Sequence, residues 1–101
     1  MLVRSFAILC ATASLAMAAC SLKYIYADGT TSIREVQADE CYTVPAGRPR
    51  DVDTVLVVGL NGYGSVETYG KRGCRDLLET GQTPLKVTKP QIYSAYILSC
   101  P

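Results

Sequence analysis

The 101-residue sequence contains no histidine and no tryptophan, and its single phenylalanine, Phe6, lies near the amino terminus. Without histidine, the chain lacks the usual general base at neutral pH, the commonest nitrogen ligand of zinc and any Ser-His-Asp triad. The five cysteines include no Cys-x-x-Cys pair for zinc binding or redox chemistry. We therefore expect neither catalytic residues nor a metal or cofactor site, and we expect that the chain is not an enzyme.

A surplus of charge of either sign is also missing. The sequence has ten basic and nine acidic side chains, and Arg4 alone accounts for the difference. Proteins that bind nucleic acid through its phosphates, and peptides that lyse membranes, need a basic surplus. We therefore expect no nucleic-acid partner.

The amino-terminal segment has the pattern of an export signal. Arg4 supplies one positive charge, and residues 5–19 are then all apolar or small. This run is shorter than the roughly 20 residues that span a membrane, and it ends in the small-residue pattern Ala16-Met17-Ala18 that signal peptidase accepts. We predict a signal peptide at residues 1–18 and one secreted, extracellular domain at residues 19–101, with cleavage after Ala18 or Ala19 left open. No membrane span is expected.

Four cysteines remain after removal of this segment: Cys20, Cys41, Cys74 and Cys100. An even number of cysteines in a small exported domain predicts two disulfides, because such domains are too small to rely on an apolar core alone. Spacing alone leaves all three pairings open.

An alternative interpretation concerns Cys20. The residues Met17-Ala18-Ala19-Cys20 approximate a bacterial lipobox, in which the cysteine is acylated and the protein becomes an envelope lipoprotein. Acylation would leave three cysteines, an odd number, whereas the disulfide interpretation uses all four. We therefore prefer the disulfide interpretation.

Short β-strands dominate the expected secondary structure. The dipeptides Asp28-Gly29 and Asn61-Gly62 predict tight turns between strands, and no long segment has the 3.6-residue period of a helix. Residues 76–80 fit either a strand or one helical turn, and residues 47–53 are expected to form an exposed loop. The expected strands cover residues 21–26, 31–36, 41–44, 52–60, 65–69, 85–88 and 92–100.

A weak internal repeat suggests how these strands combine. Placing Tyr26 on Tyr69 aligns 19 positions without a gap, ending with Val44 on Val87. Similar closing strands, residues 52–57 and 92–97, follow the two copies. Two four-strand units can bury one apolar face each against the other, which predicts an all-β fold, a small β-sandwich of two Greek-key-like units.

This pattern resembles a βγ-crystallin Greek-key pair, in which a strand ends in tyrosine, a glycine-containing turn follows, and a closing strand begins near serine or threonine. The chain also resembles the small cysteine-rich secreted proteins of filamentous fungi. That resemblance rests on residues 40–45 (ECYTVP), 53–57 (DTVLV), 66–69 (VETY) with Cys74 five residues on, and the final Ser99-Cys100. The resemblance implies an exported, disulfide-bonded protein of the kind studied as candidate effectors or antimicrobial proteins.

The βγ-crystallin resemblance also implies a possible calcium site, which the sequence does not support. The family's site needs adjacent Asn or Asp residues and two hydroxyl residues before the closing strand. Residues 50–55 and 89–94 keep only part of this pattern, whereas calcium takes six to eight oxygen ligands. We expect Asp51 and Asp53 to solvate a loop and to bind no calcium.

Surface recognition is the function that remains. Seven tyrosines are present, and Tyr63 lies between two glycines in a turn, where packing alone does not explain it. We predict a contact surface made of Tyr63, Lys71 and Arg72. We expect a monomer that binds a protein or cell-surface target outside the cell. Inhibition of a secreted hydrolase through residues 45–49 is a second hypothesis.

Overall fold

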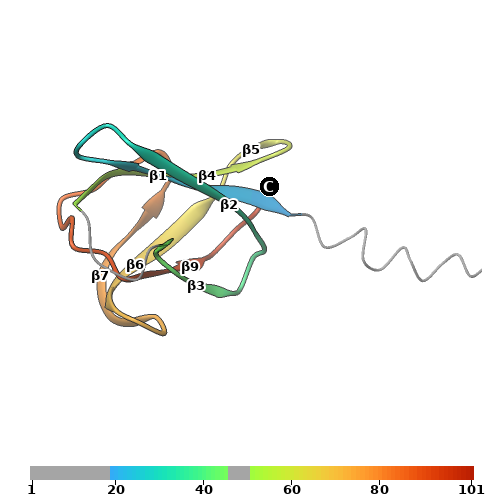
Figure 1. Cartoon of the computed structure of the whole chain (residues 1–101). Helices are drawn as coiled ribbons and strands as arrows, with labels where there is room; N and C mark the ends of the chain where they lie inside the picture. Colours follow the sequence, from blue (N-terminus) through green and yellow to red (C-terminus); the bar gives the residue numbers. More distant parts are fainter. Residues whose placement is uncertain (1–18, 46–50) are drawn as a thin grey trace, which may run out of the picture.

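The computed structural model describes residues 19–45 and 51–101, so the predicted signal peptide, Cys10 and residues 46–50 of the predicted loop lie outside the described residues. The described part is all β, and its strands form two antiparallel sheets that pack face to face (Figure 1). The all-β prediction is confirmed. Residues 76–80, for which a helical turn was the alternative, belong to a strand.

The first sheet has the order β2-β1-β4-β5, with β8 also paired to β4. The second sheet has the order β3-β9-β6-β7. The strands are β1 (Cys20–Tyr26), β2 (Thr31–Val36), β3 (Cys41–Thr43), β4 (Val52–Gly59), β5 (Gly62–Tyr63), β6 (Ser65–Lys71), β7 (Arg75–Gln82), β8 (Leu85–Lys86) and β9 (Ser94–Ile97).

The two halves of the chain exchange their short third strands. Strand β3 of the first half pairs with β9 in the second sheet, and β8 of the second half pairs with β4 in the first sheet. Corresponding hydrogen bonds follow each exchanged strand: the Val44 amide donates to the Tyr93 carbonyl, and the Val87 amide donates to the Asp53 carbonyl, both at 2.9 Å. Val44 and Val87 are the residues that the predicted repeat aligns.

The core lies between the inner faces of the sheets. Strand β1 alternates buried and half-buried side chains along its length, as expected for a strand with one face in the core. Burying each large apolar side chain contributes about 1.5–3 kcal/mol to folding. The fully buried apolar side chains of the two sheets include Leu22, Val55, Val57, Val66 and Ile97.

The closing strand of the second half is shorter than the sequence predicts. Strand β9 begins at Ser94, because Pro90 offers no amide hydrogen and its carbonyl accepts the Ile92 amide in a tight turn. Strand β9 ends at Ile97, although the Leu98 amide still donates to the Ser65 carbonyl of β6 at 2.9 Å before the chain runs to Cys100. In the first half, β4 covers residues 52–59 of the strand expected at residues 52–60, so residues 52 and 53, where the expected loop and strand overlap, belong to the strand.

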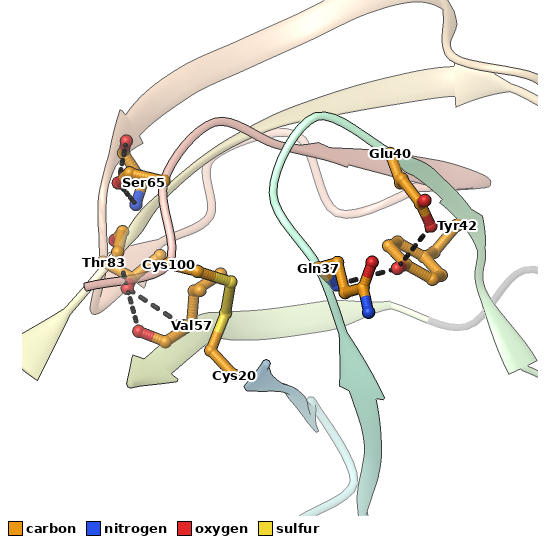
Figure 2. The surroundings of a disulfide bond; sticks show 10 residues. Cys20, Gln37, Glu40, Tyr42, Val57, Ser65, Thr83 and Cys100 are labelled. Carbon is orange, nitrogen blue, oxygen red and sulfur yellow. Dashed lines mark hydrogen bonds between the residues drawn. A yellow bond between two sulfur atoms is a disulfide. The ribbon is translucent and has the colours of Figure 1, made fainter. Parts of the chain in front are cut away.

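Both expected disulfides form, and the structure resolves their pairing. Cys20 bonds to Cys100 and so joins the start of β1 to the end of the chain, as Figure 2 shows. Cys41 bonds to Cys74 and joins β3 to the turn between β6 and β7. Two intramolecular disulfides in so small a domain are typical of extracellular proteins.

The buried hydroxyl of Tyr24 gives a first test of this core. Its side chain is 1% exposed, burial raises its pKa, and its hydroxyl has no hydrogen-bond partner among the described residues. A buried polar group without a partner costs free energy. We expect Tyr24→Phe to leave the free energy of unfolding unchanged or to raise it by about 1 kcal/mol in urea denaturation.

Tyr26→Phe is the matched control, because the Tyr26 hydroxyl is hydrogen-bonded to Ser32 Oγ at 2.9 Å. This variant should lose about 1 kcal/mol. A greater loss from Tyr24→Phe than from Tyr26→Phe would show that the Tyr24 hydroxyl does find a partner in solution.

Candidate functional site

Tyr63 lies in β5, at the end of a hairpin that extends the first sheet. It is paired with Val58 of β4, and its side chain is 47% exposed. Its carbonyl accepts a hydrogen bond of 2.8 Å from Gln82 Nε2, which ties this hairpin to the second sheet. The backbone is therefore held in place while the aromatic ring remains available to a partner.

Other apolar side chains, all of them exposed except the half-buried Leu56, accompany Tyr63 on the first sheet. Val58 of β4 and Tyr63 of β5 are direct cross-strand neighbours. Two residues further along β4, Leu56 is opposite Lys23 of β1, which is in turn opposite Ile33 of β2. Cross-strand neighbours point to the same face, here the face away from the core. Together with the hairpin tip, we call this set the apolar surface of the first sheet: Ile33, Leu56, Val58, Leu60 and Tyr63.

The exposure of this surface is large for apolar side chains. Leu60 is 91% exposed and Ile33 is 63% exposed. Clusters of exposed apolar residues on a soluble protein indicate interaction sites more often than isolated ones do. Four of the six large apolar residues that are exposed in the described part belong to this surface, so most of the exposed apolar residues are gathered on one sheet.

Lys71 and Arg72 lie elsewhere. Lys71 is the last residue of β6 and Arg72 follows it in the turn to β7; both are exposed, and this end of β6 lies far from β5 (Figure 1). The six residue steps along β6 span about 20 Å. The structure therefore does not join Tyr63 to Lys71 and Arg72 as one patch, because strand β6 separates them.

The turn that carries these basic side chains is firmly attached. Ser94 Oγ donates to the Lys71 carbonyl at 2.6 Å and accepts from the Cys74 amide at 3.0 Å, while Cys74 is bonded to Cys41. Ser94 itself is fully buried. The hydroxyl residue that the sequence placed near the start of the closing strand thus fixes a neighbouring turn.

A second surface feature was not predicted from the sequence. An open depression of about 510 Å³ lies between β2 and the start of β3, beside Ala19. The Arg34 guanidinium stacks on the Tyr42 ring, 4.6 Å from its centroid. The Tyr42 hydroxyl accepts from the Gln37 amide at 2.8 Å and donates to Glu40 Oε1 at 2.9 Å, as Figure 2 shows.

These contacts orient the tyrosine and the arginine. Partial burial raises the pKa of Tyr42, although the hydrogen bond from the Gln37 amide favours its ionised form. The ring therefore stays neutral at physiological pH and supports the guanidinium by its π face. The only sequence signal was a basic and an aromatic residue on two successive predicted strands.

The acids considered for calcium have other partners. Asp53 Oδ1 forms an ion pair of 2.7 Å with Lys86 Nζ, and the hydrogen bond from Lys86 lowers the pKa of this carboxyl. Asp51 accepts a hydrogen bond from Gln91. Within residues 19–45 and 51–101, no three acidic or cysteine side chains are grouped as metal ligands.

Glu79 of β7 attaches the segment that follows β8. Its Oε1 accepts from the amides of Thr88 and Lys89 at 2.9 and 3.2 Å, and its Oε2 accepts from Thr88 Oγ1 at 3.0 Å. Burial alone would raise the pKa of this carboxyl, but these hydrogen bonds outweigh it and hold the pKa below its usual value.

This arrangement predicts a pH-dependent contribution to stability. Because the folded-state pKa is lowered, the ionised carboxylate stabilises the fold above the ordinary glutamate pKa, and this effect is lost as the pH falls through the folded-state value. We expect Glu79→Gln to lower the free energy of unfolding by about 1 kcal/mol at pH 7. The difference from the unmodified protein should shrink as the pH is lowered from 7 to 3 in urea titrations.

Glu35→Gln is the control, since the exposed Glu35 side chain accepts no hydrogen bond from the described residues. It should leave stability unchanged at both pH values. A loss for Glu79→Gln that is equally large at pH 3 would contradict a role for the charge.

No helix in the described residues is long and apolar enough to cross a membrane. Comparison of the chain with models of protein families, with curated proteins and with solved structures gives no match.

Proposed function

We propose that the chain is a secreted, non-enzymatic binding protein that recognises a protein or cell-surface target outside the cell. The observation that carries the proposal is the apolar surface of the first sheet. Leu60 and Tyr63 stand exposed on a hairpin whose backbone is anchored. A well-fixed aromatic residue among apolar neighbours is typical of the energetic centre of a protein interface.

The biological class follows from the resemblance to small cysteine-rich fungal proteins. We propose a candidate effector or an antimicrobial protein, built from two Greek-key units like those of the βγ-crystallins. The exchange of β3 and β8 between the sheets and the corresponding hydrogen bonds of Val44 and Val87 support this kinship.

The disulfide of Cys20 favours a soluble product over the lipoprotein alternative. Its sulfur is bonded to Cys100, and the same sulfur cannot also carry a lipid. Intact mass spectrometry of the exported protein separates the two. We expect a free amino terminus at Ala19 or Cys20 and a mass four hydrogens below that of the reduced chain; an added diacylglyceryl group would overturn secretion as a soluble protein.

The binding role is tested with the folded protein carrying a fluorescent label. Binding to intact plant, fungal and bacterial cells, followed by growth or cell-death assays, identifies the target class. We expect Leu60→Ser with Tyr63→Ser to weaken binding at least tenfold, because both side chains would lose their apolar contacts.

Lys71→Ala with Arg72→Ala is the matched control, since these exposed residues lie at the far end of β6. This variant should bind like the unmodified protein. Equal binding by the Leu60 and Tyr63 variant, with circular dichroism unchanged, would show that the apolar surface is not the contact site.

A further inference from the structure

Each sheet of the sandwich has edges, and one edge strand differs from the others. Strand β3 has three residues and carries a disulfide at Cys41. Strand β7 has a register shift opposite Thr68 and Tyr69 and a left-handed residue at Asp76, features that blunt an edge against pairing. Strand β2 pairs with β1 over six consecutive residues with no shift.

Strand β2 is therefore the long, regular edge of the described part, and no described strand pairs with its outer side. A strand in this position has unpaired amide and carbonyl groups along that side. Residues 33–35 are exposed whichever face of the sheet they point to, so β2 is accessible from both faces. Its Ile33 also belongs to the apolar surface described above.

The positive charge of Arg34 on this edge has no acidic partner within ion-pair distance among the described residues. Residues 1–18 and 46–50 contain no aspartate or glutamate. The neighbouring Glu40 carboxylate accepts from the Tyr42 hydroxyl. Stacking on Tyr42 holds the guanidinium in place while its donors remain open towards the depression.

From these observations, we propose that β2 accepts an extended segment of the partner polypeptide as an added antiparallel strand. The partner's backbone pairs with the free edge, its carboxylate side chain pairs with Arg34, and an apolar side chain packs on Ile33. This is the β-strand addition by which several extracellular and signalling domains bind peptides. The inference rests on the proposed binding function and names the kind of partner.

A second copy of the chain does not supply the missing carboxylate. In an antiparallel pair, directly opposed residues point to the same face of the sheet. Arg34 would then meet Ser32, Arg34 or Val36 of the copy, while Glu35 points to the opposite face. Self-pairing therefore leaves Arg34 without a counterion, and a different chain with a suitably placed acid is the better occupant.

The probe is the peptide acetyl-Thr-Val-Glu-Val-Thr-amide, which reads the same in both directions and places its acid opposite Arg34 and a valine opposite Ile33. We expect its titration into the ¹⁵N-labelled, oxidised protein to shift the amides of residues 31–36 and the Arg34 Nε–H. The same peptide with lysine in place of glutamate should bind at least fivefold more weakly.

Arg34→Gln should remove this preference, so that both peptides bind equally, whereas the control Arg75→Gln should keep it. A glutamate peptide methylated on its backbone nitrogens should not bind, because it cannot complete the ladder. The proposal is overturned by no shift at millimolar peptide, by shifts centred on another strand, or by sedimentation of a β2-paired dimer. If the peptide does not bind but binding to cells still depends on Leu60 and Tyr63, strand addition alone is overturned. If the peptide does not bind and binding to cells does not depend on Leu60 and Tyr63, the proposed function is overturned as well.

Discussion

Replacing Cys20 and Cys100 with alanine is expected to lower the free energy of unfolding by about 4–5 kcal/mol. The bridge closes a loop across 80 residues of sequence, so it removes much of the conformational freedom of the unfolded chain. Cys20 is also 4% exposed and packs in the core, which adds the loss of buried sulfur contacts. A domain of this size has a total stability of only about 4–12 kcal/mol, so the variant should be close to unfolding.

The second bridge gives the comparison. Cys41–Cys74 spans 33 residues, for which the same relation gives about 3.7 kcal/mol, and Cys41 is exposed. We therefore expect the Cys41→Ala with Cys74→Ala variant to be the more stable of the two in guanidinium denaturation, with a melting temperature lowered by a smaller amount.

Equal losses of stability in the two variants, or a greater loss on removal of Cys41–Cys74, would contradict this order. If the Cys20 and Cys100 variant does not fold, the same comparison is made by stepwise reduction of the unmodified protein. The Cys41–Cys74 bridge, whose Cys41 is exposed, should then open at a lower dithiothreitol concentration than Cys20–Cys100. Reduction of Cys20–Cys100 first would contradict the predicted order.

Much of the fold follows from local patterns in the sequence. The alternation along β1 predicts which of its side chains are buried, and the turn at Asp28-Gly29 needs the left-handed conformation that Gly29 adopts at φ 89°. The even number of cysteines predicts two bridges. Their pairing does not follow, because it depends on which strand ends meet, and spacing says nothing about that.

The exchange of β3 and β8 could not be predicted for a related reason. These strands have three and two residues, so each contains too little pattern to indicate its sheet. The contact of Arg34 with Tyr42 likewise depends on how β2 and β3 leave their common turn. Local sequence determined the strands, whereas the positions of the candidate sites depend on contacts between distant segments.

Gly64, between β5 and β6, packs closely against Ser99 and Val57, which are distant from it in the sequence or in another strand. A side-chain carbon at this buried position would overlap the Ser99 carbonyl oxygen and would lie 2.8 Å from Val57 Cγ1. The glycine cannot move away easily, because its amide donates to the Val57 carbonyl at 2.7 Å and its own carbonyl accepts from the Thr83 amide at 2.9 Å. Since the backbone of Gly64 is held in place against these two groups, we expect Gly64→Ala to lower the free energy of unfolding by at least about 3 kcal/mol in urea denaturation.

Gly70→Ala is the control for a glycine in the same strand region. Its added carbon would lie 3.2 Å from a carboxylate oxygen of Asp76, a side chain that can turn away, so we expect a loss below about 1 kcal/mol. If Gly64→Ala does not fold, Thr83→Val tests the same crossing without a clash. The buried Thr83 hydroxyl donates to the Gly64 carbonyl at 2.7 Å and accepts from the Val57 amide at 2.9 Å, and its removal should cost about 2–3 kcal/mol. Wild-type stability in either variant would show that the contacts at Gly64 contribute little to holding the two sheets together.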